Sequence, residues 1–445
     1  MRRYLIGLLA LGFAVGCGVS NPAGDPPADG PAGPAPADGG VTDAAVAPGS
    51  PDGAPADLGS TGPDFGDRAG PWPTADLTPY GASSGLDAPI LDSSADDAQN
   101  IWAASAGALY LLRPGHTTFE KFTAADGLHI GPFTDPTGSP AMTNITAIAA
   151  GRGDEVFVGY QGYETLGDPY QDTEAQKELG NADRVTVDAA GKLTVVRYLF
   201  RCDYEHSTCW ENRSPRRMIF AHTGIAAGHL FIGFNHGVSH VYADQFGDHV
   251  HPEVWYVGSD GSRTEKIGEW YGLALTPAGD LWMGGRYGVG LQPWNAVPHF
   301  SWVDGRFIYA FTIYSGDHGL DVPVGYREDE RAIAVAPDGT VWFASLTHGL
   351  ASWNPQTTHG NYQQIVAWGS KDGLPTDLVD VAADPDGTLW LVTSGGALER
   401  FNPASGTVTA WPGVSGVRRI HLDQTVTPRA LYLAMDSGVA VIRAK

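Results

Sequence analysis

Basic residues are scarce in this sequence. Its 445 residues include 27 Lys and Arg against 50 Asp and Glu, which sets a formal net charge of −23. The chain also has no basic stripe and no alternation of basic and aromatic residues. Because binding to nucleic acid depends on a cationic surface, these absences argue against a nucleic-acid partner.

Long apolar runs are missing as well. The run from Leu5 to Val15 follows Arg2-Arg3 and is far too short to cross a bilayer, so it predicts an export signal. Ala14-Val15-Gly16-Cys17 resembles a bacterial lipobox, which implies cleavage before Cys17 and lipidation of that thiol. Gly18 follows in place of an aspartate, which favours the outer membrane. The alternative is an ordinary secretory signal in which Cys17 is incidental.

Large apolar side chains are almost absent from residues 18–71, which consist mainly of Pro, Ala, Gly and Asp. Such a segment cannot bury enough surface to offset the entropy lost on ordering. We therefore expect a signal peptide at 1–17, a disordered acidic tether at 18–71 and a folded domain at 72–445. The tether would hold the domain away from the membrane, which the protein would touch through its lipid alone.

Cysteine is the third scarce residue, with three in the chain. If Cys17 carries lipid, Cys202 and Cys209 remain, and an oxidising periplasm would pair them. The short loop between them predicts a contribution of about 2.5 kcal/mol to stability. The rival interpretation is a metal site with His206 between two thiolates, although the close spacing and the fourth ligand of such sites are lacking.

What the sequence does contain is a repeated unit of short strands. In Asp372–Pro403, three predicted strands are separated by the turns Pro385-Asp386-Gly387 and Gly395-Gly396. The aromatic residue of the second strand, followed by small residues and a turn, recurs seven times, at Trp102, Phe157, Phe231, Trp282, Trp342, Trp390 and Tyr432. A unit this short cannot bury its own faces, so the units must pack on one another.

The spacing of about 40–60 residues is typical of propeller blades. The sequence therefore predicts an all-β fold, a seven-bladed β-propeller. The last unit ends after three strands, and Ala75–Gly81 stands where other units have a fourth. We expect this N-terminal strand to complete the last blade and close the ring, which removes the free sheet edges.

Asp372–Pro403 resembles the two-component regulator propeller repeat. The matching residues are Gly373-Leu374-Pro375, Asp384, Gly387, Leu389-Trp390, Thr393, Gly395-Gly396, Leu398, Arg400 and Asn402-Pro403. Asp317–Pro355 matches more loosely, and Ala125–Leu128 keeps a fragment. Propellers of that family often form the periplasmic sensing part of signalling receptors. This chain ends at Lys445 with neither a transmembrane helix nor a kinase, so the resemblance implies binding of a ligand or partner, and it supplies no catalytic residues.

Candidate site residues come from the loops that depart from the repeat. The loop after the aromatic strand and the loop that leads into the next blade lie on the same face of a propeller, the loop-bearing face. Polar, aromatic and basic residues gather in these loops in blades two to five, namely Tyr160, Gln161, Arg217, Asn235, His236, Arg286, Tyr287, Asp317, His318, Arg327 and His348. They predict a ligand-binding site, because propeller loops are variable surface on a rigid scaffold.

Two classes of function remain open. The first is binding or sensing of a glycan, peptide or protein by a monomeric propeller. The second is a lyase or hydrolase in which a loop histidine acts as general base and an arginine stabilises an oxyanion. No nucleophile motif is present and no cofactor is expected. His249 and His251 are weak candidates for metal ligands on a loop of the opposite face.

Overall fold

The computed structural model describes Trp72 and residues 77–134, 140–161, 182–198, 214–234, 238–242, 245–250, 253–257, 263–267, 270–285, 288–292, 294, 301–303, 306–308, 312–314, 330–355, 357 and 365–445. The predicted signal peptide (1–17), the predicted tether (18–71), and Cys17, Cys202 and Cys209 therefore lie outside the described residues. The described residues all belong to the compact unit Ser60–Lys445.

Within the described residues, the strands form seven four-stranded antiparallel sheets. In hydrogen-bonded order, the first sheet is β2 (Asp92–Ala95), β3 (Ile101–Ser105), β4 (Ala108–Leu112), β5 (Glu120–Phe122), and the second is β8 (Ile145–Ala150), β9 (Glu155–Tyr160), β10 (Ala182–Val187), β11 (Leu193–Tyr198). The third sheet is β12 (Arg217–Phe220), β13 (His229–Gly233), β14 (Val238–Tyr242), β15 (Gln245–Val250), and the fourth is β18 (Trp270–Leu275), β19 (Leu281–Gly285), β20 (Gly288–Gln292), β23 (Thr312–Tyr314). The fifth sheet is β24 (Glu330–Val335), β25 (Val341–Ser345), β26 (Gly349–Trp353), β27 (Val366–Trp368), and the sixth is β28 (Leu378–Ala383), β29 (Leu389–Thr393), β30 (Leu398–Asn402), β31 (Thr407–Ala410).

The remaining four-stranded sheet joins the two ends of the domain. It consists of β32 (Val417–Asp423), β33 (Ala430–Met435), β34 (Gly438–Arg443) and β1 (Leu77–Tyr80). In it β1 pairs with β34 from Leu77 opposite Ile442 to Tyr80 opposite Val439.

In the described parts of the connections between these strands lie three two-stranded hairpins and three short 3-10 helices. The hairpins are β6 (Gly131–Thr134) with β7 (Pro140–Thr143), β16 (Glu253–Val257) with β17 (Arg263–Ile267), and β21 (Ser301–Val303) with β22 (Arg306–Ile308). The 3-10 helices that the structure describes span Ala82–Ser84, Ala124–Asp126 and Ser370–Asp372.

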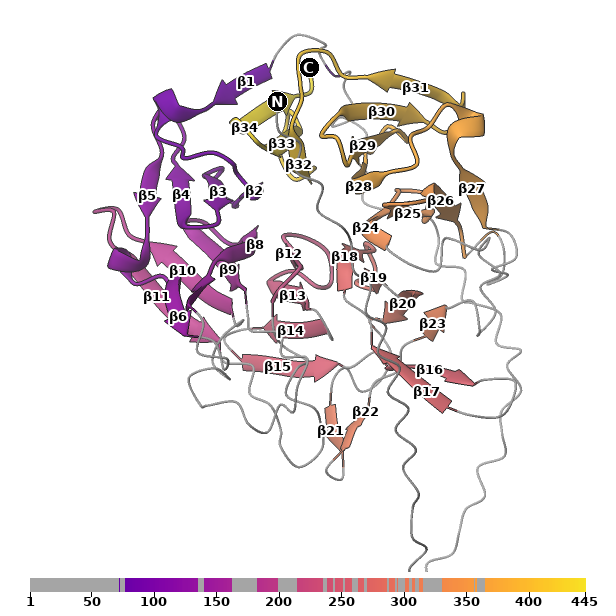
Figure 1. The fold of residues 1–445 in the computed structure, drawn as a ribbon, viewed down its shortest axis with the longest axis horizontal. Helices are drawn as coiled ribbons and strands as arrows, with labels where there is room; N and C mark the ends of the chain where they lie inside the picture. The colour runs from indigo at the N-terminus through magenta and orange to yellow at the C-terminus, as the bar shows by residue number, and fades with distance from the viewer. Residues whose placement is uncertain are drawn as a thin grey trace, which may run out of the picture. The chain divides into compact units, whose positions relative to one another are not determined.

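The first strands of the seven sheets contact one another in a closed cycle. β2 contacts β8, and the series continues through β12, β18, β24, β28 and β32, which contacts β2 again. These strands lie innermost, and the later strands of each sheet extend outward (Figure 1). Sheets arranged in this way around a common centre are the blades of a β-propeller. The all-β propeller fold is thereby established.

The core is divided among the interfaces between neighbouring sheets. Between the first two sheets, for example, Trp102 and Leu109 pack with Val156 and Val158, and all four side chains are buried. All seven aromatic residues of the repeat lie in second strands and are at most 5% exposed. Because every sheet needs a neighbour on both faces to bury these side chains, the repeat specifies the packing of sheet on sheet.

In two of the sheets the same hydrogen bond connects the repeat tryptophan to the turn that precedes it. The carboxylate of Asp96 accepts a hydrogen bond from the Trp102 indole at 2.9 Å, and that of Asp384 accepts one from the Trp390 indole at 3.2 Å. In both sheets the aspartate follows the inner strand and precedes the tryptophan by six residues. Burial raises the pKa of Asp96, and the hydrogen bonds that it accepts oppose that rise only in part.

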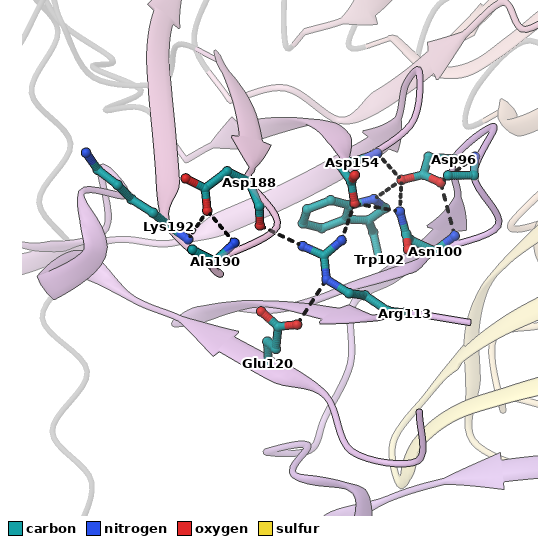
Figure 2. A network of polar contacts seen from close by, with 10 residues as sticks. Asp96, Asn100, Trp102, Arg113, Glu120, Asp154, Asp188, Ala190 and Lys192 are labelled. Atoms are coloured by element: carbon teal, nitrogen blue, oxygen red, sulfur yellow. Dashed lines mark hydrogen bonds and ion pairs between the residues drawn. The ribbon is translucent and has the colours of Figure 1, made fainter. Parts of the chain in front are cut away.

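Polar contacts connect the first and second sheets on the side of these turns (Figure 2). The Asp96 carboxylate also accepts from the backbone N–H of Asp154, at 2.9 Å, and Asn100 donates to the side chain of Asp154 at 3.0 Å. Arg113 pairs with Asp154 and with Glu120, and donates to the backbone carbonyl of Asp188. Since every group here has a protein partner, we assign this network to the packing of sheets.

Candidate functional site

Four of the residues predicted from the loops lie in the described part of the chain. Tyr160 is the last residue of β9 and is only 2% exposed, so it is not the surface residue that the loop pattern predicts. Gln161 is exposed and accepts a hydrogen bond from Asn144. His348 bonds through Nδ1 to the hydroxyl of Thr347, 2.6 Å away.

Arg217 differs most from the prediction. The pattern places it in the loop that leads into the third blade, but it is the first residue of β12 and its side chain is only 12% exposed. The reason is the partner that the tertiary structure supplies, Asp380, whose carboxylate lies within the ring and attracts the guanidinium inward.

The other predicted residues are not tested by the structure. Asn235, His236, Arg286, Tyr287, Asp317, His318, Arg327 and His251 lie outside the described residues. The prediction of a loop at His249 is wrong, because Gln245–Val250 continues the sheet as β15, where His249 is paired with Ser239. The placement of the His249 side chain is outside what the structure describes.

A layer of charged residues crosses the centre of the ring. Each inner strand contributes one residue to it, the residue that pairs with the second strand two positions after the repeat aromatic. In chain order these residues are Asp92, Ala147, Arg217, Gly272, Ala332, Asp380 and Arg419. We call these seven residues the charged layer. Its small members leave room for the long arginine side chains to reach across the centre.

Two ion pairs hold this layer together. Arg217 donates both terminal nitrogens to Asp380, at 2.6 and 3.2 Å, and thereby joins the third and sixth sheets. Arg419 pairs with Asp92 at 2.8 Å and also donates to the backbone carbonyl of Arg216, 3.0 Å away. Burial by itself lowers the pKa of Arg217, but the Asp380 carboxylate outweighs it and the net effect is a raised pKa, so the guanidinium remains charged.

Both carboxylates of the layer also bind the next sheet. Asp92 accepts a hydrogen bond from the backbone N–H of Ile148, at 3.0 Å, and Asp380 accepts one from that of Ile420, at 2.9 Å. Asp92 is 4% exposed and Asp380 is 1% exposed. Buried carboxylates are tolerated only when paired and hydrogen-bonded, and each of these receives an arginine and at least one backbone amide.

A group of basic and aromatic side chains lies beside the charged layer, at the N-terminal end of the inner strands. The Tyr271 ring has the guanidinium carbon of Arg331 4.2 Å from its centroid and that of Arg216 5.9 Å away. These distances are those of cation–π contacts. Inner strands begin at the loop-bearing face, so this group, which we call the arginine–tyrosine cluster, lies near that face in sheets three to five.

A second polar group, His129–Asp183–Tyr160, joins two residues of the second sheet, Tyr160 of β9 and Asp183 of β10, to His129 in the connection that precedes β6. Nδ1 of His129 is 2.6 Å from Oδ2 of Asp183, and the Tyr160 hydroxyl donates to the same oxygen at 2.7 Å. Asp183 is fully buried, whereas the His129 side chain is 34% exposed. A buried carboxylate that orients a partly exposed imidazole is the arrangement found behind many general bases.

Sequence reasoning missed most of these residues, although some signals were available. His129 follows Gly127-Leu128 at the position where the most regular blade has Pro375. Nothing local to Asp92, Asp380 or Arg419 marks them, because their role depends on strands far away in the chain.

Among the described residues, no group of three or more His, Cys, Asp or Glu side chains is arranged to hold a metal ion. Within the same part of the chain, no helix has the length and apolar character needed to span a membrane.

No family model matches this sequence, and no curated protein matches it either. Among solved structures, the chain is similar to one described as "YCF48 bound to D1 peptide", at 15% identity over 84% of this chain and 96% of that one, with a TM-score of 0.48. It is also similar to one described as "Streptogramin B lyase structure", at 11% identity over 83% of this chain and 97% of that one, with a TM-score of 0.48. At these values neither likeness says anything about the activity of this chain.

Proposed function

We propose that this chain is a binding propeller of seven blades that engages an acidic ligand or protein partner at its loop-bearing face. The closed cycle of inner strands and the pairing of β1 with β34 support seven blades closed by an N-terminal strand. In this arrangement the last sheet contains strands from both ends of the domain.

The observation that carries the proposed binding is the arginine–tyrosine cluster. The protein as a whole is strongly acidic, with a net charge of −23, yet two guanidinium groups flank one aromatic ring at the start of the inner strands. Guanidinium groups bind carboxylates through two parallel hydrogen bonds, and an adjacent ring supplies apolar contact. Carboxylate-bearing peptides and polysaccharides have the matching chemistry.

The test is binding of two fluorescent probes of equal length, an oligoglutamate and an oligoglutamine, followed by fluorescence anisotropy. We expect the acidic probe to bind and Arg331→Gln to weaken it about tenfold. The control is Arg418→Gln, because Arg418 is an exposed arginine of β32 that pairs with Asp436. Equal binding of both probes, or equal effects of the two substitutions, would contradict the proposal.

We further propose that Cys17 carries lipid and that the protein is held at the bacterial outer membrane, with Cys202 and Cys209 as a disulfide. The lipobox-like residues before Cys17 and the spacing of the other two cysteines support this. Substitution Cys17→Ser should move the protein from the membrane fraction to the soluble fraction. Retention of the variant in the membrane would contradict lipid anchoring.

A second candidate function is that of a lyase or hydrolase, and His129–Asp183–Tyr160 is the observation that favours it. The buried carboxylate would orient His129 as a general base toward a ligand on the loop-bearing face. Mass spectrometry of glycans and peptides after incubation with the protein would detect cleavage. An enzyme should lose that activity in His129→Gln, whereas a binding protein leaves every probe unchanged.

A further inference from the structure

A small cavity lies within the ring, beside the charged layer. Its volume is about 100 Å³, and its walls come from β2, β8, β12 and β32 and the turn after β12. The polar side chains in its lining are Asp92, Ser93, Ser94, Arg217, His222, Arg419 and His421. A space of this size holds several water molecules or one small ion.

Cationic side chains outnumber anionic ones in the lining of the cavity, unlike in the protein as a whole. Arg217 and Arg419 contribute two positive charges, and Asp92 contributes one negative charge. Asp380, which pairs with Arg217, and Asp97, whose carboxylate lies 2.6 Å from Nδ1 of His222, are not part of the lining. The two histidines can add to the positive charge but not to the negative charge. In addition, the buried hydroxyl of Ser93 has no hydrogen-bond partner in the described part of the protein.

His421 differs from the residues at the equivalent position of the other six inner strands. The inner-strand residues that pair with the repeat aromatic are Ser94, Ala149, Ile219, Ala274, Ala334, Ala382 and His421. Six of the seven are small or aliphatic, and His421 alone brings a group that can gain a charge. It lies two residues after Arg419 and therefore on the same side of β32.

We propose that this cavity is a binding site for a small free oxyanion of the sulfate or phosphate class, held by Arg217, Arg419 and the protonated form of His421. Guanidinium and imidazolium groups are the donors that oxyanions require. The small volume selects a free ion over an anionic group on a polymer. The site differs from the arginine–tyrosine cluster and does not depend on what binds there.

The surroundings of His421 set its protonation. The groups that face it are Asp92 on β2, Arg217 on β12, His222 in the turn after β12, Arg419 and Asp423 on its own strand, and Tyr432 on β33. Burial is the largest influence and lowers the pKa of His421, and His222 and Arg217 act in the same direction. Asp423 and Asp92 oppose them. Without an anion the imidazole is therefore neutral near pH 7.

An anion in the cavity would reverse this balance, because it stabilises the imidazolium. Binding would then take up one proton from solvent, and by linkage the affinity would rise as the pH falls. Sulfate is the probe that isolates this effect, since its own charge does not change near neutral pH. Inorganic phosphate serves as a second probe of the same geometry.

The experiment is isothermal titration of sodium sulfate into the full chain at about pH 6 and about pH 8, in two buffers of different ionisation enthalpy. We expect binding about tenfold tighter at the lower pH, with uptake of about one proton. Absence of sulfate binding at both pH values would overturn the proposal. Binding whose affinity and proton uptake do not vary with pH would overturn the role of His421.

Variants separate this site from surface binding. His421→Gln should bind sulfate with a weaker dependence on pH than the unaltered chain, because His222 is then the one histidine left in the lining, and Arg419→Gln should abolish binding. His116→Gln is the matched control, since His116 is an exposed histidine of another sheet. If Arg419→Gln does not fold because Asp92 loses its partner, Asp92→Asn combined with Arg419→Gln removes both charges. Sulfate binding that persists in that double variant would contradict the site. Because oligoglutamate binding is measured separately, failure here leaves the proposed function standing.

Discussion

Replacement of Arg217 by methionine tests the charged layer most directly. The substitution keeps the apolar stem but removes the guanidinium that donates to Asp380 at 2.6 and 3.2 Å. Asp380 is 1% exposed, so its carboxylate would be left in the interior with the backbone amides of Val381 and Ile420 as its described donors. A buried carboxylate without its counter-ion is strongly destabilising.

Breaking a buried ion pair from one side costs about 3–5 kcal/mol. We expect Arg217→Met to lower the free energy of unfolding by about 3 kcal/mol, the lower end of that range, because Asp380 keeps two amide donors and Arg217 is 12% exposed. Adding Asp380→Asn removes the unpaired charge and preserves an oxygen that accepts from Ile420. The double variant should therefore recover about half of the loss.

The assay is unfolding in guanidinium chloride followed by tryptophan fluorescence, with circular dichroism to confirm folding. The control is Arg418→Met, whose side chain is 44% exposed, and we expect it to cost less than about 1 kcal/mol. The reasoning is refuted if the double variant is less stable than Arg217→Met, or if Arg217→Met costs no more than Arg418→Met.

Three further predictions concern pH, the N-terminal strand and Trp72. Since the pKa of His421 is lowered in the folded state, the unfolded chain binds more protons at acid pH. Stability should therefore fall as the pH drops through the ordinary histidine pKa, and less so in His421→Gln, as urea midpoints would show. Gly438 has φ +139°, and an added Cβ would lie 2.0 Å from the Tyr80 carbonyl oxygen. Gly438→Ala should lower the melting temperature and expose β1 to proteolysis, whereas Gly107→Ala, with open space around it, should not. Trp72 is 6% exposed and packs edge-on against Trp390, with ring centroids 5.1 Å apart, so Trp72→Ala should cost about 3 kcal/mol in chemical unfolding; an unchanged free energy of unfolding would show that this packing does not stabilise the domain.

The positions of the strands in the regular units were largely accessible from the sequence. Strand alternation and turn residues are local, so the units around Trp102, Trp390 and Tyr432 could be located without a structure. The Asp384–Trp390 contact follows from the same repeat. The prediction of a loop at His249 was wrong because a fourth strand, β15, includes this residue.

The candidate site was accessible only in part. The loop pattern pointed to sheets two to five, and the arginine–tyrosine cluster and the Asp183–Tyr160 pair lie in these sheets. That this sector binds a ligand stays a prediction. It assigned surface roles to Tyr160 and Arg217, which are in fact buried and paired. Polar residues at the end of a strand face either solvent or a partner, and only the packing of neighbouring sheets decides which.

By itself, the sequence determined the repeat, the all-β architecture and the identity of the buried aromatics, because each depends on residues a few positions apart. Only the tertiary structure decided that Asp92 meets Arg419 and that Arg217 meets Asp380, pairs separated by 327 and 163 positions. The physical reason is that the ring brings the inner strands of distant repeats together at its centre, where buried charges must be paired or hydrogen-bonded.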